Sequence, residues 1–195
     1  MMELKTKLRY ILQLILFLYL YHFYGEIFFL NKILELIFIA AFVILFIKTQ
    51  NSFDILRYLS YKNFKKYLSK RYIVLWLTVL FFLVIGLSRI SYMNKYDLFI
   101  ACVYAPIFEE LIYRLVIGRY LKVIFKKTWI ACLITTVIFT LRHTVQEPQK
   151  LISVFIGGLI FFIIFEKNET IYISMIIHSL WNLIYSISST VINNT

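Results

Sequence analysis

The sequence predicts an all-α protein, a polytopic transmembrane bundle of about seven helices, with six or eight also compatible with the pattern. Of the 195 residues, 62% are hydrophobic and 16% are charged. Soluble domains of this length are usually about half apolar and a quarter charged, so lipid must cover much of this surface. The apolar residues also fall into separate runs of spanning or near-spanning length, with basic segments between them. We therefore expect a single transmembrane domain over residues 1–195.

Three predicted spans lie in the N-terminal half. The first run, Tyr10–Leu30, follows the charged start Met1–Arg9 and lacks a small-residue cleavage site, so we predict a retained span rather than a signal peptide. The second, Ile33–Ile47, is short for a bilayer of about 30 Å and is expected to extend into its flanks or to form a hairpin with the first. The third is Tyr72–Ser88.

A basic segment, Thr49–Arg71, separates the second and third runs and is the only long loop predicted. Two interpretations of it stay open: an amphipathic segment in the lipid headgroup layer, or a solvated basic loop. The first rests on apolar residues that recur at roughly helical spacing among lysines, namely Phe53, Leu56, Leu59, Phe64, Tyr67 and Leu68.

Four further runs complete the bundle. They are Leu98–Ile117, Trp129–Arg142, Leu151–Phe165 and Ile171–Ser189. Within the first of them, Pro106 removes a backbone hydrogen bond and is expected to kink the helix.

Lysine and arginine predict the orientation of these spans. With a cytoplasmic N-terminus, fifteen basic residues fall in inside segments and four in outside segments. Cytoplasmic loops carry such an excess, so the N-terminus is placed inside and the C-terminus outside. The net charge of +11 therefore requires no nucleic acid partner. The outside residues are Lys32, Arg89, Lys95 and Lys150, and the inside residues are Lys5, Lys7, Arg9, Lys48, Arg57, Lys62, Lys65, Lys66, Lys70, Arg71, Arg119, Lys122, Lys126, Lys127 and Lys167.

Charged side chains at membrane depth are the first sign of a site. Glu109, Glu110 and Arg114 would each cost about 2.5–3.5 kcal/mol if unpaired near the bilayer centre, so they are expected to face the bundle interior or a water-filled cavity. Glu110 and Arg114 are four residues apart and share a helix face, whereas Glu109 is turned about 100° away. One carboxylate is then neutralised by the arginine and the other is left for chemistry. The alternative is an ion pair that only joins helices.

Two other predicted helices carry polar groups. His143 ends its run, four residues after Phe139, and alone it would more often be a satisfied interfacial histidine. His178 and Asn182 are also four apart and lie inside the last run, where both need partners and could simply tie helices together. Taken with Glu109, these groups suit hydrolysis of an amide by water. The carboxylate would accept a proton from water, His143 would orient it, and His178 with Asn182 would stabilise the oxyanion.

These motifs resemble those of the CPBP family, also called the CAAX protease or Abi family. Its EExxxR motif is met by Glu109, Glu110 and Arg114, its FxxxH motif by Phe139 and His143, and its HxxxN motif by His178 and Asn182. The three occur in the family's order on successive predicted spans. The resemblance covers about Ala105–Ile184.

The resemblance implies a multi-helix intramembrane fold with a catalytic core at 97–189, preceded by N-terminal helices and a basic loop at 1–96. It implies metal-independent proteolysis near the C-terminus of prenylated proteins, or processing of peptide bacteriocins and protection against them. It assigns Glu109 as general base, His143 to water activation and His178 with Asn182 to oxyanion stabilisation. Glu110, Arg114 and Phe139 are implied to have supporting roles.

Three positions depart from the family pattern. Leu115 and Arg142 stand where glycine and a small residue are usual, and Phe162 stands where a second glycine can follow Gly157 and Gly158. These changes are expected to narrow the cavity or to add a charge beside it.

The expected function is an intramembrane endopeptidase of CAAX-protease type in a bacterial cell membrane. Its expected partners are membrane lipid and a peptide or lipid-modified protein substrate, with no cofactor and no metal. One alternative is a non-proteolytic bacteriocin immunity or membrane scaffold protein of the same family. Another is a metalloprotease or transporter: no HExxH motif is present, but Glu109, His143 and His178 could still meet around a metal.

Overall fold

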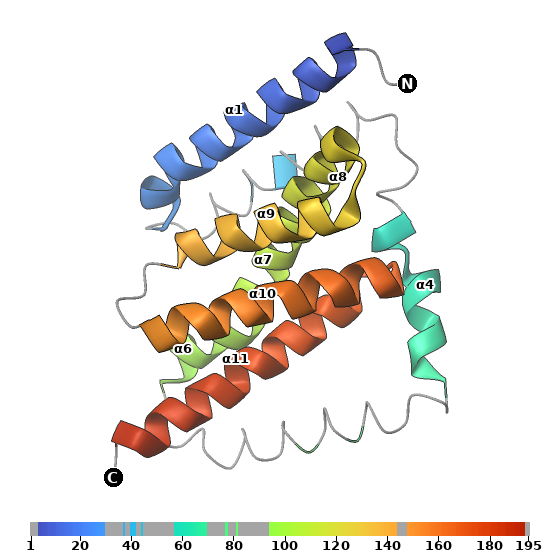
Figure 1. Ribbon diagram of the computed structural model, residues 1–195. Coiled ribbons are helices and arrows are strands. Elements are labelled where there is room, and N and C mark those ends of the chain that lie inside the picture. Colours follow the sequence, from blue (N-terminus) through green and yellow to red (C-terminus); the bar gives the residue numbers. More distant parts are fainter. Residues whose placement is uncertain are drawn as a thin grey trace.

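The computed structural model describes residues 4–29, 57–69, 94–143 and 148–193, together with positions 37, 40, 41, 44, 77 and 81. Within these ranges all regular elements are helices, which confirms the all-α class (Figure 1). The predicted spans Ile33–Ile47 and Tyr72–Ser88 fall outside the described residues, apart from isolated positions.

The helices follow the predicted runs but extend beyond several of them. They are α1 (Leu4–Phe29), α4 (Tyr61–Lys65), the 3-10 turn η1 (Lys66–Leu68), α6 (Lys95–Phe99), the π-helical η4 (Ile100–Tyr104), α7 (Ala105–Glu109), the π-helical η5 (Glu110–Gly118), α8 (Arg119–Phe125), α9 (Thr128–Arg142), α10 (Pro148–Asn168) and α11 (Ile171–Asn193).

The elements α6, η4, α7, η5 and α8 form one continuous helical rod. The backbone stays right-handed helical at each junction and ends at Lys126, which has a left-handed φ of 57°. Pro106 explains the change of pattern near its middle. The N–H of Ala105 donates to the carbonyl of Ile100, five residues back, and Pro106 has no N–H for the carbonyl of Ala101. The disturbance expected at the proline is thus a π-helical segment directly before it.

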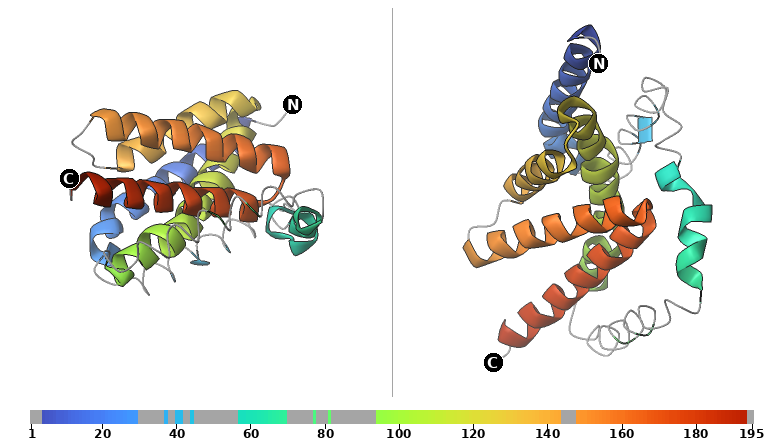
Figure 2. Two further views of the ribbon diagram at one scale, coloured as in Figure 1. Left: turned by 90° about the horizontal axis from the view of Figure 1, so that it is seen from below. Right: turned by 45° about the vertical axis from the view of Figure 1, so that its right-hand side comes forward.

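The helices α9, α10 and α11 run up and down beside this rod. α10 packs against both α9 and α11, and α1 crosses over α8 (Figure 2). Gly158 allows α10 to approach α9 closely, because a Cβ there would lie 2.9 Å from the Thr136 methyl group. The buried core is rich in aromatic side chains, among them Tyr113, Tyr120, Phe139, Phe162 and Phe165.

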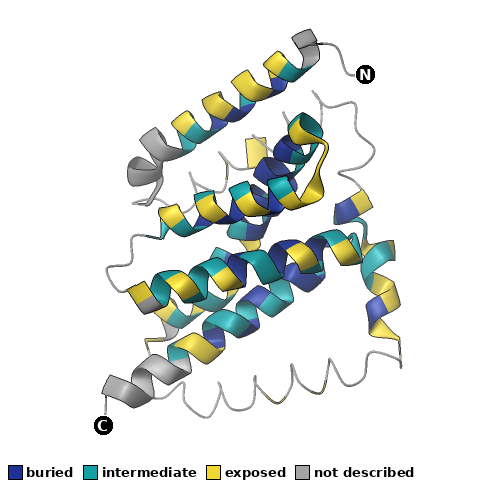
Figure 3. Ribbon diagram, in the orientation of Figure 1, coloured by how far each residue is buried: buried dark blue, intermediate teal, exposed yellow. Residues whose placement is uncertain are grey.

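The outward faces of these helices are apolar. Within the described residues, Lys150–Asn168 is long and apolar enough to cross a membrane, and Thr128–Arg142 and Ile171–Ser186 are apolar but shorter. Large apolar side chains such as Trp129 and Leu141 of α9 are exposed. Figure 3 shows exposed positions recurring along α9 and α10. Such a surface suits a lipid environment.

Part of the predicted basic loop is an ordered short helix. The segment α4–η1 lies against the turn between α10 and α11. The Tyr67 hydroxyl donates to Asn168 Oδ1 at 2.6 Å, and the Tyr172 hydroxyl donates to the carbonyl of Leu59 at 2.8 Å. Arg57 forms an ion pair with Glu169 in the same turn. The inner face of the α4–η1 segment is therefore fixed to the bundle. A freely solvated loop would not make these contacts.

Candidate active site

Glu110 is enclosed in the bundle and neutralised there. Both Glu110 and Arg114 have no exposed side-chain surface, and Arg114 Nε donates to Glu110 Oε2 at 3.3 Å. The guanidinium also lies over the ring of Phe139, 5.2 Å from its centroid. The pairing expected from the four-residue spacing is present, and it offsets part of the cost of burying each charge, since the two terminal guanidinium nitrogens of Arg114 are buried without a hydrogen-bond partner.

Two residues of α11 complete the set of partners of Glu110. The Ser174 hydroxyl donates to Oε2, and His178 Nδ1 lies 3.0 Å from Oε1. Since a carboxylate accepts hydrogen bonds, Nδ1 is the protonated nitrogen of this imidazole in that contact. Ser174 is one helical turn before His178, so the same face of α11 supplies both contacts.

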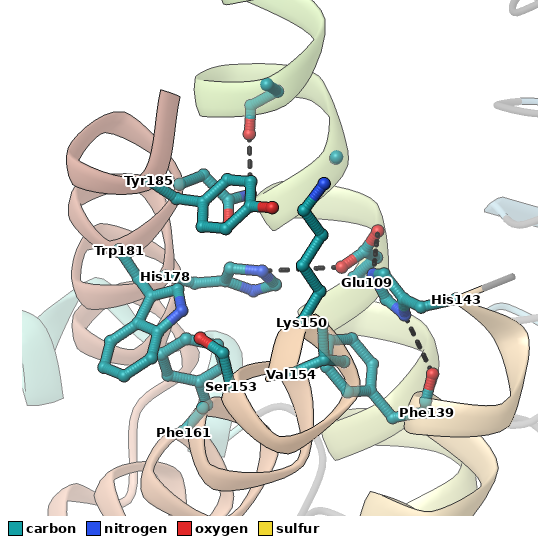
Figure 4. A pocket seen from close by; sticks show the side chains of 14 residues that line it. Glu109, Phe139, His143, Lys150, Ser153, Val154, Phe161, His178, Trp181 and Tyr185 are labelled. Atoms are coloured by element: carbon teal, nitrogen blue, oxygen red, sulfur yellow. Dashed lines mark hydrogen bonds and ion pairs between the residues drawn. The ribbon is translucent and has the colours of Figure 1, made fainter. Parts of the chain in front are cut away.

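Glu109 points instead toward a pocket. Its side chain is 22% exposed, with His178 Nε2 3.4 Å from Oε2 and His143 Nε2 3.9 Å from Oε1. Figure 4 shows the carboxylate between the two imidazoles, on the wall of the cavity. Glu109 and His143, which the sequence places on different predicted spans, converge in the structure. The adjacent glutamates thus occupy different environments.

The tautomer of His143 follows from its neighbour. His143 Nδ1 lies 2.9 Å from the carbonyl oxygen of Phe139, which can only accept, so Nδ1 carries a proton. Nε2 therefore faces Glu109 with its lone pair when the ring is neutral. The Phe139 ring contacts both imidazoles, tilted against His143 with centroids 4.5 Å apart and edge-on to His178 with centroids 6.0 Å apart. Phe139 thus orients His143 through its backbone and its ring.

Asn182 joins α11 to the π-helical segment η4. Its amide nitrogen donates to the carbonyl of Ala101 at 2.8 Å. This is the carbonyl for which Pro106 provides no N–H, so the asparagine replaces a hydrogen bond that the helix cannot make. One amide N–H is used in this way, and the other remains for a ligand.

The pocket has a volume of about 290 Å³ and is mainly apolar. Glu109, His143, His178 and Asn182 all line it, together with residues that the sequence did not indicate. Those are Ala101, Ala105, Lys150, Ser153, Val154, Gly157, Phe161, Trp181 and Tyr185 (Figure 4). Phe139, which the sequence did indicate, also lines the pocket. Ser174 and Trp181 could have been predicted from the sequence, because they lie four residues before and three residues after His178 and so share its face of α11. Lys150 and Ser153 were not, because the rotation of α10 is set by packing.

Leu115, Arg142 and Phe162 do not narrow the cavity as expected. None of the three is among the residues that line the pocket. Leu115 is buried in the core, and Arg142 lies over the ring of Tyr21. Phe162 packs onto Gly118, where an added Cβ would lie 2.8 Å from the phenyl ring. These departures from the family pattern are absorbed in helix packing.

The described part of the chain contains no group of three or more His, Cys, Asp or Glu side chains arranged to hold a metal ion. The imidazoles around Glu109 are held by other partners: His143 by the backbone carbonyl of its own helix, and His178 by Glu110 of η5 and Phe161 of α10. What the arrangement offers chemically is a partly exposed carboxylate, two imidazoles and an amide around one cavity.

Comparison with known proteins identifies one family. The model described as type II CAAX prenyl endopeptidase Rce1-like matches residues 75–184, which is more than half of the chain. All seven residues of the three motifs lie within that match. No curated protein and no solved structure matches this chain.

Proposed function

Because the chain belongs to the Rce1-like family of type II CAAX prenyl endopeptidases, we propose that it is an intramembrane endopeptidase in which Glu109 activates the attacking water. The proposed substrate is a membrane-associated or prenylated protein or peptide. The observation that supports this most is the position of Glu109, in a pocket and within 3.9 Å of His143 Nε2 and 3.4 Å of His178 Nε2.

The first step is deprotonation of a water. Glu109 Oε1 and the lone pair of neutral His143 Nε2 are 3.9 Å apart, so one water can donate a hydrogen bond to each. The proton passes to Glu109 as the water oxygen attacks the substrate carbonyl carbon. A well-placed general base of this kind contributes about 10²–10⁴-fold to the rate.

The oxyanion of the tetrahedral intermediate needs donors at the pocket wall. Asn182 has one amide N–H that is not used by Ala101 and can serve. His178 donates through Nε2 once that atom accepts the proton from Glu109, 3.4 Å away. The resulting imidazolium faces the carboxylate of Glu110 through Nδ1, which stabilises the charge. The proton then moves to the leaving amine nitrogen as the C–N bond breaks.

The test is cleavage of prenylated and unprenylated peptides by the purified protein in liposomes. Glu109→Gln and His143→Ala are compared with wild type, each with and without a chelator. We expect both substitutions to abolish cleavage and the chelator to have no effect. A chelator that abolishes wild-type cleavage would instead favour the metal-dependent alternative.

The alternative without proteolysis is an immunity or scaffold protein that binds a toxin or partner through the same pocket. It predicts no cleavage of any peptide by folded wild-type protein. It also predicts that wild type and Glu109→Gln protect cells against a toxin to the same extent.

A further inference from the structure

One end of the bundle carries exposed lysines from three separate elements. They lie on α4, on the turn between α8 and α9, and at the end of α10, and we name them the basic rim. Its members are Lys62, Lys65, Lys126, Lys127 and Lys167, all of which are exposed.

Contacts between side chains place these three elements at the same end of the bundle. Lys122, near the end of α8, pairs with Glu166, near the end of α10. The Tyr67 hydroxyl of η1 donates to Asn168, the last residue of α10. Figure 1 shows α4 beside the C-terminal end of α10, with the α8–α9 turn above them on the same side of the molecule.

The glutamates at this end do not neutralise the basic rim. Glu166 pairs with Lys122 and lies 4.0 Å from Arg119, and Glu169 pairs with Arg57. Among the described residues, none of the five rim lysines forms an ion pair. This end of the molecule therefore presents excess positive charge outward, beyond what its own carboxylates balance.

The basic rim also lies at the level where a membrane ends. Within the part of the chain that the structure describes, α10 is long enough to span, and it stops at Asn168, with α11 beginning at Ile171. The segment α4–η1 is hydrogen-bonded to this turn, so it is held at the boundary of the apolar region. Its outer face exposes Tyr61 and Leu68, at 60% and 50%, beside the lysines. Aromatic and aliphatic anchors mixed with lysine are typical of an interfacial helix.

We propose that the basic rim binds the anionic headgroups of phospholipids in the adjacent leaflet, with Tyr61 and Leu68 inserted beside them. Lysine ammonium groups attract the phosphate of these lipids, and each lysine near an anionic surface strengthens binding by about fivefold. The proposal selects the headgroup interpretation of the basic segment over the solvated loop. It does not depend on proteolysis.

The test measures lipid preference directly. The full-length protein is reconstituted in phosphatidylcholine vesicles that contain trace spin-labelled phosphatidylglycerol or spin-labelled phosphatidylcholine. The fraction of each label immobilised at the protein gives their relative association. We expect wild type to prefer phosphatidylglycerol several-fold, and we expect Lys62→Gln/Lys65→Gln/Lys126→Gln/Lys127→Gln to lose most of this preference. High salt should reduce it in wild type.

Two controls make the result decisive. Lys62→Arg/Lys65→Arg keeps the charge and should keep the preference, and Arg142→Gln removes one exposed charge from the opposite end of α9 and should also keep it. Because the rim lysines are exposed and unpaired by described residues, thermal unfolding of the quadruple variant should match wild type. An equal preference in wild type and the folded quadruple variant would overturn the proposal, and so would a preference that salt does not change.

Discussion

His178 lies between two neighbouring glutamates, with one ring nitrogen facing each. Nδ1 lies 3.0 Å from Glu110 and Nε2 lies 3.4 Å from Glu109, while Phe161 stacks on the ring face at 4.3 Å between centroids. Turning the ring away would break its hydrogen bond to Glu110 and its stacking on Phe161. At the scale of single residues, the site is therefore organised by a histidine that is itself held by a carboxylate and an aromatic ring.

The first prediction separates the two glutamates. Glu110→Gln should lower the free energy of unfolding by about 3–5 kcal/mol, because it leaves the buried Arg114 without its carboxylate. Glu109→Gln should change stability little, because Glu109 makes no comparable buried pair. Thermal unfolding in detergent and peptide cleavage measure the two effects, with cleavage lost in Glu109→Gln. If the two variants unfolded alike, the division of roles between the glutamates would be wrong.

The sequence predicted contacts within one helix better than contacts between helices. The pairing of Glu110 with Arg114 followed from a spacing of four residues, and so did the shared face of His178 and Asn182. The partner of Asn182, the carbonyl of Ala101, could not be predicted, because a backbone group carries no signal in the sequence. The catalytic roles of these residues stay predictions until activity is measured.

At the scale of helices, the link between α11 and η4 gives a second prediction. Asn182→Ala should cost about 1–3 kcal/mol, because the carbonyl of Ala101 is left unpaired. In a Pro106→Ala background, residue 106 regains its N–H and can bond to that carbonyl, so the same substitution should cost less. A double-mutant cycle of unfolding free energies measures the difference. Equal costs in both backgrounds would show that the proline does not create the need for Asn182.

Two adjacent glycines of α10 give a matched pair of substitutions as the third prediction. In Gly158→Ala the new Cβ would meet Thr136 at 2.9 Å and Phe139 at 3.1 Å, so α9 and α10 must separate, at a cost of about 1–3 kcal/mol. In Gly157→Ala the nearest atoms, in Phe161 and Trp181, are 3.4 Å away, which is ordinary contact. Stability should fall in the first variant and stay level or rise in the second, as thermal unfolding would record.

At the scale of the whole molecule, two ion pairs tie other elements to the C-terminal part of α10 and the turn that follows it. Glu166, whose side chain is 14% exposed, joins α10 to α8 through Lys122, whereas Glu169, 42% exposed, pairs with Arg57, which is 56% exposed. The fourth prediction is that Glu166→Gln lowers the unfolding free energy clearly more than Glu169→Gln. Exposed pairs contribute only about 0–1 kcal/mol, whereas breaking a more buried pair strands a charge. Equal effects in denaturation experiments would contradict this.

Hydrophobic runs predicted the class of the whole molecule and the positions of α9, α10 and α11 closely. They did not predict that helical structure continues from Lys95 to Phe125, because Lys95 and Arg119 lie outside the apolar run that signals a span. Nor did they predict that α4–η1 docks on the α10–α11 turn, since its anchors are tyrosines within a basic segment. Such contacts depend on three-dimensional packing rather than on periodicity.

The π-helical segments η4 and η5 have a consequence for how this chain corresponds to its relatives. In a π-helix each backbone hydrogen bond joins residues five apart, whereas in an α-helix it joins residues four apart. Each π-helical segment is therefore equivalent to a small insertion within the helix. A relative with an uninterrupted α-helix here would match Glu109 and Arg119 only if a gap were placed inside the rod. Positional equivalence through this helix is therefore better judged by side-chain contacts, such as Glu110 with Ser174, than by counting residues.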